Sequence, residues 1–549
     1  MYGQSNGFRL SLAFLAGILS AGSSFPEIHL PWLAWLAPGL ILWVTHGASG
    51  KSVFRAGFVA GLGHCLVSFY WLLLIPFPWF GVAGWLALSA WLALYLAAWC
   101  GVCWYLLPRR KLPEKFGEQP SNFTAIWLAL SPGQRAAWPL LCAVAWVAME
   151  MALGRILTGF PFITLGVPQF RLLPLIQIAS LTGVYGVSFL VAWFSIALMG
   201  AVVAWRGGQK PFPSASLQLA PPLLVIGCVT LFGLNKLSAP EDVSARLKIA
   251  LVQPSIPERV IWDPREQTNR FLKLMELSRA ALAAKPDLLV WPEAALPEIL
   301  GRNHYTQETI GDLVRPAQVS MVMGIIDIRP QPGAPGKFEA FNSAFLIDPQ
   351  GELAGHYDKT HLVVFGEYLP GWLRHFPFLA RLRRAADLGR GERPTAFQLK
   401  KPPAKFPVSI CFEDCFPDEI RRRVDPDTDF ILNLTNDGWF GDSATQWQHA
   451  ATALFRAVEN GIPLVRCTNN GLTCWVDARG RLHDIHFPGS QNIYAAGWKI
   501  ADVPLRSNHH PTFYTRHGDW FGWACVGIVI IAMSLRAFNS SYRALRSLR

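Results

Sequence analysis

Long apolar runs dominate the first 240 residues of the chain, and one more lies near its C-terminus. As a helix, each could cross a hydrocarbon layer of about 30 Å. The pattern therefore predicts a membrane α-helical bundle of eight transmembrane helices, and the first run is interpreted as a retained helix rather than a cleaved signal peptide because six more follow it. The runs lie at residues 8–24, 28–46, 53–75, 81–107, 137–154, 176–205, 219–237 and 520–536.

The stretch between the seventh and eighth runs alternates short β-like segments with amphipathic helical ones. This alternation predicts an α/β sheet covered by helices on both faces. We therefore divide the chain into N-terminal transmembrane helices (1–238), an α/β domain (239–510) and a C-terminal helix with a basic tail (511–549). The β-like segments are Leu247 to Gln253, Asp287 to Trp291, Val319 to Ile325, Phe341 to Ile347, Pro407 to Cys411, Phe430 to Leu434 and Pro463 to Cys467, and the helical ones include Gln267 to Ala284 and Thr445 to Glu459.

Composition agrees with a membrane protein, since 52% of the residues are hydrophobic and the mean hydropathy is +0.27. The net charge is +12, and the basic residues lie mostly in short loops between apolar runs, which argues against a nucleic-acid partner. Their uneven distribution between alternate loops predicts the orientation of the chain in the membrane. The short loops on the side of the membrane with few basic residues contain only Arg155 and Arg171. Both termini are therefore predicted to be cytoplasmic and the α/β domain to lie outside. Fourteen basic residues lie on the cytoplasmic side: Arg9, Lys51, Arg55, Arg109, Arg110, Lys111, Lys115, Arg135, Arg206, Lys210, Arg536, Arg543, Arg546 and Arg549.

Three residues whose side chains can take part in catalysis each follow a separate β segment. Glu293 ends the run DLLVWPE, Lys359 lies in HYDKTHLVVFGE, and Cys411 follows the strand FPVSI. A thiol needs a base or a neighbouring cation to react at neutral pH, and a Glu and a Lys would supply both. We expect the three to meet because one sheet brings its strand ends together.

These motifs resemble those of the nitrilase (carbon-nitrogen hydrolase) superfamily and, within it, the bacterial apolipoprotein N-acyltransferases. The resemblance implies an αββα sandwich for the α/β domain. Val364 and Phe412 stand where the family usually has Pro and Tyr. The matching motifs are WPE at Trp291 to Glu293, YDKxHLVxFGE at Tyr357 to Glu367, CFE at Cys411 to Glu413, NLTNDGWFG at Asn433 to Gly441, QHA at Gln448 to Ala450, RAVENGIPLVR at Arg456 to Arg466 and TNNG at Thr468 to Gly471.

The resemblance assigns a catalytic role to five residues. Cys411 would be the nucleophile, Glu293 would accept its proton, and Lys359 would stabilise the thiolate and the oxyanion. Glu367 would orient Lys359 or Glu293, and Glu413 lies beside the nucleophile. The expected substrate-binding residues are Trp262, Asn342, Phe412, Trp439 and Phe440.

The implied reaction is a ping-pong transfer. An acyl chain would pass from a phospholipid to Cys411 and then to the N-terminal amine of a diacylglyceryl-modified apolipoprotein. We expect an inner-membrane monomer with a periplasmic catalytic domain, no cofactor and no metal. The alternatives are a membrane-tethered amidohydrolase of nitrilase type and a non-catalytic membrane scaffold or transporter.

The other candidate residues have weaker signals. Cys467 and Cys474 could pair in an oxidising compartment. Cys415 is predicted to point away from Cys411, because Pro417 turns the chain. His449 is interpreted as a helix-surface or pocket-wall hydrogen bonder, since the expected triad needs no histidine.

Overall fold

The structure is a computed structural model that divides into two compact units. It describes residues 6–547 except 48, 109–122, 163, 208–210, 241–242, 262, 297–303, 332, 334, 372–386, 394 and 507–509. The helical unit comprises residues 1–73, 77–238 and 517–549, and the α/β unit comprises residues 74–76 and 239–516.

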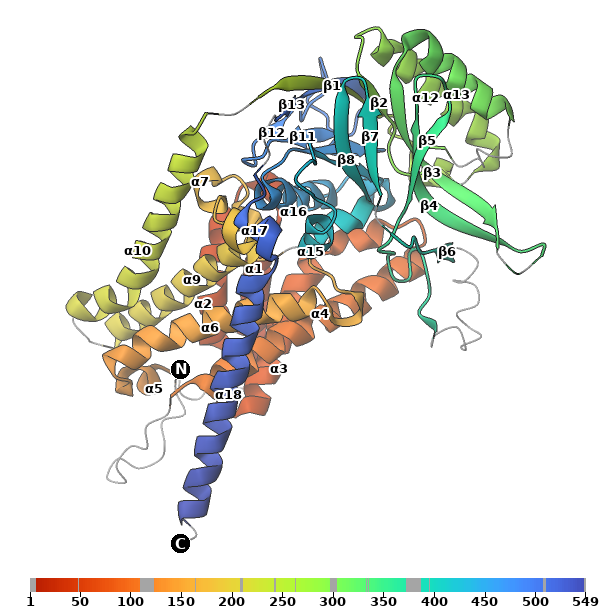
Figure 1. Ribbon diagram of the computed structural model, residues 1–549. Helices are drawn as coiled ribbons and strands as arrows, with labels where there is room; N and C mark the ends of the chain where they lie inside the picture. Colours follow the sequence, from red (N-terminus) through yellow and green to blue (C-terminus); the bar gives the residue numbers. More distant parts are fainter. Residues whose placement is uncertain are drawn as a thin grey trace. The chain divides into compact units, whose positions relative to one another are not determined.

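The helical unit consists of α-helices joined by short 3-10 turns (Figure 1). Its described helices are α1 (Asn6–Ala21), α2 (Ala37–Thr45), α3 (Gly50–Ser68), α4 (Pro78–Leu106), α5 (Phe123–Ala129), α6 (Pro132–Leu153), α7 (Leu173–Ile176), α8 (Ala179–Thr182), α9 (Val184–Arg206), α10 (Pro211–Ser238) and α18 (Trp520–Ser547).

The predicted number of eight transmembrane helices is not confirmed. Within the described part of the chain, six helical segments are long and apolar enough to cross a membrane. The run at 28–46 folds instead into 3-10 turns and the nine-residue helix α2, and the run at 53–75 gives the 19-residue helix α3, which is not one of the six. The six segments are Asn6–Ser24, Pro78–Leu106, Pro132–Leu153, Val184–Arg206, Leu217–Ser238 and Trp520–Tyr542.

Small residues allow α3 and α4 to approach closely. A Cβ atom added to Gly61 would lie 2.7 Å from the Cα of Ala93, so the site has no room for a side chain. Buried indoles satisfy their N–H groups on neighbouring helices. Trp99 donates to the carbonyl of Cys142 at 3.0 Å and Trp138 to that of Cys103 at 3.0 Å. Close backbones and satisfied polar groups are what packing in lipid requires.

The α/β unit contains two β-sheets. The first has the strand order β13-β1-β2-β3-β4-β5, with β6 paired to β4, and the second has the order β12-β11-β10-β9-β8-β7. Strands β1, β2 and β3 are parallel neighbours, as are β8, β9 and β10. The strands are β1 (Ala245–Gln253), β2 (Leu288–Val290), β3 (Ser320–Pro330), β4 (Phe338–Ile347), β5 (Leu353–Asp358), β6 (Leu388–Gly389), β7 (Ala396–Lys400), β8 (Pro403–Ile410), β9 (Ile431–Thr435), β10 (Leu464–Thr468), β11 (Cys474–Val476), β12 (Leu482–His483) and β13 (Gly497–Leu505).

The two sheets pack face to face around one apolar core. Ile249 and Val290 of the first sheet belong to the same buried cluster as Val408 and Leu432 of the second. Helices α12 (Gln267–Leu282) and α13 (His304–Ala317) cover the outer face of the first sheet. Helix α16 (Thr445–Asn460) packs on the second sheet, next to α15 (Pro417–Arg421). The unit is therefore an αββα sandwich, as the resemblance implied (Figure 1).

The expectation that a single sheet brings Glu293, Lys359 and Cys411 together is wrong. Glu293 and Lys359 follow β2 and β5 of the first sheet, whereas Cys411 follows β8 of the second. Each predicted β segment does contain a strand, and both predicted helices form. Strand character is a local property, whereas the choice of neighbour depends on the whole sequence.

Candidate active site

Cys411 lies at a sharp turn directly after β8. Its φ is +52°, in the left-handed region that a residue with a side chain adopts at a cost of about 1–3 kcal/mol. A short 3-10 helix, here named the Cys411 turn (Cys411–Cys415), follows at once. Asn433 of β9 donates to the carbonyl of Cys411 at 3.2 Å and so braces the strained residue. The turn leaves Cys411 and Phe412 partly exposed, while Glu413, Asp414 and Cys415 are buried.

Glu293 is buried and lies close enough to the Cys411 thiol for the two groups to shift each other's pKa. Asn342 of β4 donates to its Oε1 at 2.7 Å, and the Lys359 ammonium lies 3.6 Å from the same oxygen. Burial raises the pKa of Glu293, although Lys359 and the hydrogen bonds oppose the shift. A carboxylate with a raised pKa accepts a proton more readily, so Glu293 is suited to act as a base toward the thiol.

Lys359 is buried between two carboxylates. Its Nζ donates to Oε1 of Glu367 at 2.8 Å, and the other oxygen of Glu367 accepts the backbone N–H of Val363 at 2.8 Å. Burial by itself lowers the pKa of Lys359, but Glu367 and Glu293 outweigh it and hold the pKa above its ordinary value. Lys359 is therefore a fixed positive charge, oriented by Glu367.

The surroundings of the Cys411 thiol favour its protonated form. Burial, and then the charge of Glu293, raises its pKa to about 12, while Lys359 and His449 favour the thiolate. The thiol must therefore lose its proton during the reaction, and Glu293 is positioned to receive it. This arrangement of base, cation and nucleophile is that of nucleophilic catalysis at a carbonyl.

Glu413 contacts the surrounding loops rather than Lys359 or Glu293. It accepts the phenol of Tyr357 at 2.7 Å, the N–H groups of Thr360 and Ile410 at 2.8 Å each, and the guanidinium of Arg423 at 3.0 Å. Burial alone would raise the pKa of Glu413, but Arg423 and these donors lower it to about 2. Glu413 thereby joins the loop that carries Lys359 to the Cys411 turn.

The residues expected to bind substrate lie in different surroundings. Asn342 uses its amide to donate to Glu293 at 2.7 Å and to Glu367 at 3.1 Å. Phe412 is partly exposed, and its ring packs edge-on against Phe416. Trp439 and Phe440 are partly exposed on a second 3-10 helix, here named the Trp439 turn (Asp437–Phe440). Trp262 lies outside the described residues.

A cluster of buried charges that was not predicted from the sequence lies behind the Cys411 turn. It consists of Asp414, Asp437, His449 and Arg466, each at most 2% exposed. His449 does form hydrogen bonds, as predicted, but the helix-surface position considered for it is wrong, because α16 is buried where His449 lies. A signal was present in the sequence, since Arg466 interrupts an otherwise apolar strand and a buried arginine requires a carboxylate partner.

Three members of this region, Asp414, Cys415 and His449, have the spacing of metal ligands. Both ring nitrogens of His449 lie at hydrogen-bonding distance from carboxylates, and Arg466 forms an ion pair with Asp414. A cation already neutralises these carboxylates, so the donor set does not fit a resident metal ion.

Cys467 and Cys474 are unpaired in the structure. The thiol of Cys467 points to the carbonyls of Val252 and Val290, at 3.4 Å from each. The pairing that the sequence left open is therefore absent here.

Comparison with known proteins identifies two parts of the chain. A family model described as carbon-nitrogen hydrolase matches residues 248–489, and one described as apolipoprotein N-acyltransferase N-terminal domain matches residues 16–197. The first match includes Glu293, Lys359 and Cys411.

Relatives align over almost the whole chain. The apolipoprotein N-acyltransferase of Geobacter metallireducens is 35% identical over 96% of this chain and 95% of its own length, and that of Brucella melitensis is 29% identical over 96% of each. Among solved structures, a mutant amidase from Nesterenkonia sp. AN1 is 18% identical over 47% of this chain and 93% of its own, with a TM-score of 0.33. A branch 10 nitrilase-superfamily protein of Saccharomyces cerevisiae is 18% identical over 49% and 93%, with a TM-score of 0.36.

Proposed function

The chain belongs to the apolipoprotein N-acyltransferases, enzymes of the carbon-nitrogen hydrolase superfamily, and we propose that it N-acylates lipoproteins in two steps through a thioester on Cys411. The acyl donor is a phospholipid and the acceptor is the N-terminal amine of a diacylglyceryl-modified cysteine. The observation that carries the proposal is that the Glu293 carboxylate, 3.6 Å from the buried Lys359 ammonium, lies close enough to the Cys411 thiol for the two groups to shift each other's pKa. All three groups come from one chain, which supports a monomeric enzyme, and neither proposed step requires a nucleic acid.

In the first step the thiol becomes acylated. Glu293 takes the proton of Cys411 as Sγ attacks the ester carbonyl of the phospholipid. The Lys359 ammonium stabilises the negative charge that develops on the carbonyl oxygen. The tetrahedral intermediate collapses, the ester C–O bond breaks, and the leaving lysophospholipid oxygen takes the proton from Glu293. The acyl chain remains on Cys411 as a thioester.

In the second step the amine removes the acyl chain. Its nitrogen lone pair attacks the thioester carbonyl while Glu293 takes an amine proton. The C–S bond breaks, an amide forms, and Glu293 returns the proton to the departing thiolate. Trp439 and Phe440, partly exposed on their turn, are proposed to contact the acyl chain and exclude water from the thioester.

Intact mass measurement tests this proposal. Purified protein in phospholipid micelles should gain the mass of one acyl chain on Cys411, and hydroxylamine should remove it. Adding a diacylglyceryl lipopeptide with a free N-terminal amine should then discharge the thioester and yield an amide.

The matched control is the same lipopeptide with an acetylated N-terminus. It should leave the thioester in place, because its amide nitrogen has no lone pair available for attack. Rapid release of free fatty acid without an acceptor would contradict the transferase and favour the amidohydrolase. Absence of both adduct and product would favour a non-catalytic scaffold.

We further propose that the chain lies in the inner membrane with both termini in the cytoplasm and the catalytic domain in the periplasm. The uneven distribution of Lys and Arg between alternate loops supports this orientation. Reporter fusions at Gly208 and at the C-terminus should therefore give a cytoplasmic signal, and a fusion at Lys401 a periplasmic one. A cytoplasmic signal at Lys401 would contradict the proposed compartment.

A further inference from the structure

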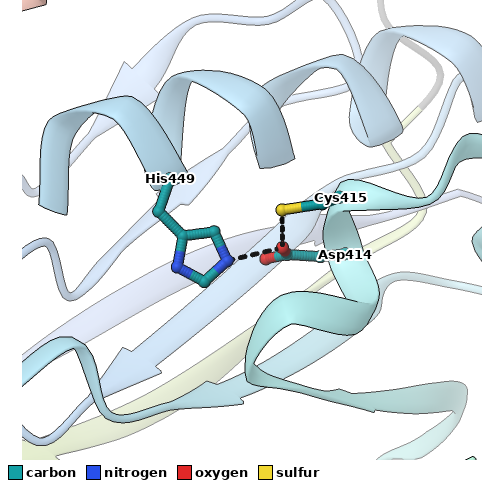
Figure 2. A group of neighbouring side chains, drawn as sticks. All are labelled: Asp414, Cys415 and His449. Atoms are coloured by element: carbon teal, nitrogen blue, oxygen red, sulfur yellow. Dashed lines mark hydrogen bonds and ion pairs between the residues drawn. The ribbon is translucent and has the colours of Figure 1, made fainter. Parts of the chain in front are cut away.

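His449 contacts the two turns that carry the proposed nucleophile and the proposed acyl-contacting aromatic residues. Its Nε2 lies 2.8 Å from Oδ1 of Asp414 in the Cys411 turn, and its Nδ1 lies 2.7 Å from Oδ1 of Asp437 in the Trp439 turn. Figure 2 shows the first contact, with the ring pointing at Asp414 and the Cys415 sulfur directed at the same carboxylate oxygen. Helix α16 thus connects two turns that are separate in the sequence.

Both contacts require a doubly protonated ring. A neutral imidazole has one N–H group and can donate to only one carboxylate, whereas an imidazolium donates from both nitrogens. Burial by itself lowers the pKa of His449, but Asp414 and Asp437 raise it well above the usual range. This bridge is therefore complete at neutral pH and is lost as the pH rises through the raised pKa of His449.

The charged surroundings complete the bridge. Arg466 of β10 forms an ion pair with Asp414 and lies 3.5 Å from Asp437, so two cations face two carboxylates. The titratable and charged groups facing the ring are Asp414, Cys411 and Cys415 from the Cys411 turn, Asp437 from the Trp439 turn and Arg466 from β10. After Lys359, His449 is the main positive influence favouring the thiolate of Cys411.

We propose that His449 is a positioning residue for acyl transfer, which as an imidazolium joins the Cys411 turn to the Trp439 turn and places its charge behind the nucleophile. The expected effect of His449 on acyl transfer rests on the proposed function. The bridge itself and the effect on the thiol are independent of any lipid substrate. They can therefore be measured separately.

The charge of His449 can be measured in the unmodified protein by histidine C2 hydrogen–deuterium exchange, resolved by peptide mass spectrometry. We expect no inflection in its exchange profile up to pH 8, whereas a free imidazole shows one near its ordinary pKa of about 6.5. An inflection of His449 near pH 6.5 would overturn the proposal, because a neutral ring cannot bridge both carboxylates.

The effect on the nucleophile can be measured with His449→Gln, with His483→Gln as the matched control. Iodoacetamide alkylation of Cys411 at pH 8 should slow by about tenfold in His449→Gln, since one unit in the pKa of a thiol changes the thiolate fraction by about tenfold. Transfer turnover should fall by at least the same factor, and the control should match the wild type. Wild-type alkylation and turnover in folded His449→Gln would overturn the proposal.

His449→Gln leaves two buried carboxylates and could fail to fold, so Asp437→Asn provides a second variant. The introduced amide can donate to one nitrogen of a neutral ring, while the other nitrogen still donates to Asp414. The hydrogen bonds that support the fold are therefore kept, but the second carboxylate that requires a charged ring is removed. The exchange profile of His449 should then gain an inflection below pH 8. An unchanged profile would contradict the role of Asp437.

A metal ion is the competing explanation for this cluster. Incubation with zinc followed by gel filtration and elemental analysis should find no stoichiometric zinc that depends on His449. One zinc ion per chain, lost in His449→Gln, would overturn the proposal. Because alkylation uses neither phospholipid nor lipopeptide, a failure of transfer with the expected alkylation result would count against the proposed function and not against the bridge.

Discussion

Replacing Cys411 by serine is expected to abolish acyl transfer, lowering turnover by at least about 10³-fold. An alkoxide is much harder to form than a thiolate, and Glu293 and Lys359 are arranged around the proton and charge of a thiol. The measurement is the acyl adduct by intact mass together with turnover on the lipopeptide. Neither adduct nor amide should form, although the protein should fold normally because the change at a partly exposed position is small.

Cys415→Ser is the matched control, four residues away. Cys415 is 1% exposed, its sulfur lies 3.7 Å from Oδ1 of Asp414, and burial raises its pKa to about 11. The thiol is therefore inert, and a serine hydroxyl could occupy the same place and donate to Asp414. Most activity should remain. Loss of transfer in Cys415→Ser with retention in Cys411→Ser would show that the nucleophile has been wrongly assigned.

Lys359→Met is expected to produce the second-largest effect, because it removes a cation that serves both chemistry and stability. Turnover should fall by about 10²–10³-fold through loss of oxyanion stabilisation. The change also leaves the carboxylates of Glu293 and Glu367 buried without their shared partner, and breaking a buried pair costs about 3–5 kcal/mol. Turnover and thermal unfolding of the same samples measure the two effects.

Lys405→Met is the appropriate control for Lys359→Met. Lys405 also pairs with a carboxylate, Asp425 at 2.5 Å, but both partners are partly exposed. Such surface pairs contribute about 0.2–1 kcal/mol, so stability and turnover should change little. If folded Lys359→Met turns over at the wild-type rate, Lys359 has no part in the mechanism.

The local sequence was sufficient to predict seven strands of the α/β unit, β1–β4 and β8–β10, but not β5–β7 or β11–β13. Glu293 and Cys411 each come directly after a short apolar segment, and both segments are strands in the structure. This works because burial and backbone conformation leave a periodic pattern over a few residues. The pattern does not specify which strands pair with one another. It therefore led us to expect one sheet, whereas the structure has two sheets that pack face to face.

The lengths of the helices in the helical unit could also be predicted only in part from the sequence. Apolar character over 28–46 and 53–75 suggested two spans, but the first breaks into short turns around α2, and α3 does not belong to the six candidate spans. Proline and glycine within these runs interrupt or weaken helices, and hydropathy alone does not record that.

By itself, then, the sequence determined the membrane character of the chain, the positions of seven strands and the Glu, Lys and Cys that follow three segments. Only the tertiary structure decided that these residues converge from two sheets, that Glu413 joins loops, and that His449 is buried between Asp414 and Asp437. The physical reason is that a charge is tolerated in a buried position only beside its partners. Those partners lie 12 to 35 residues away along the chain and meet only when it folds.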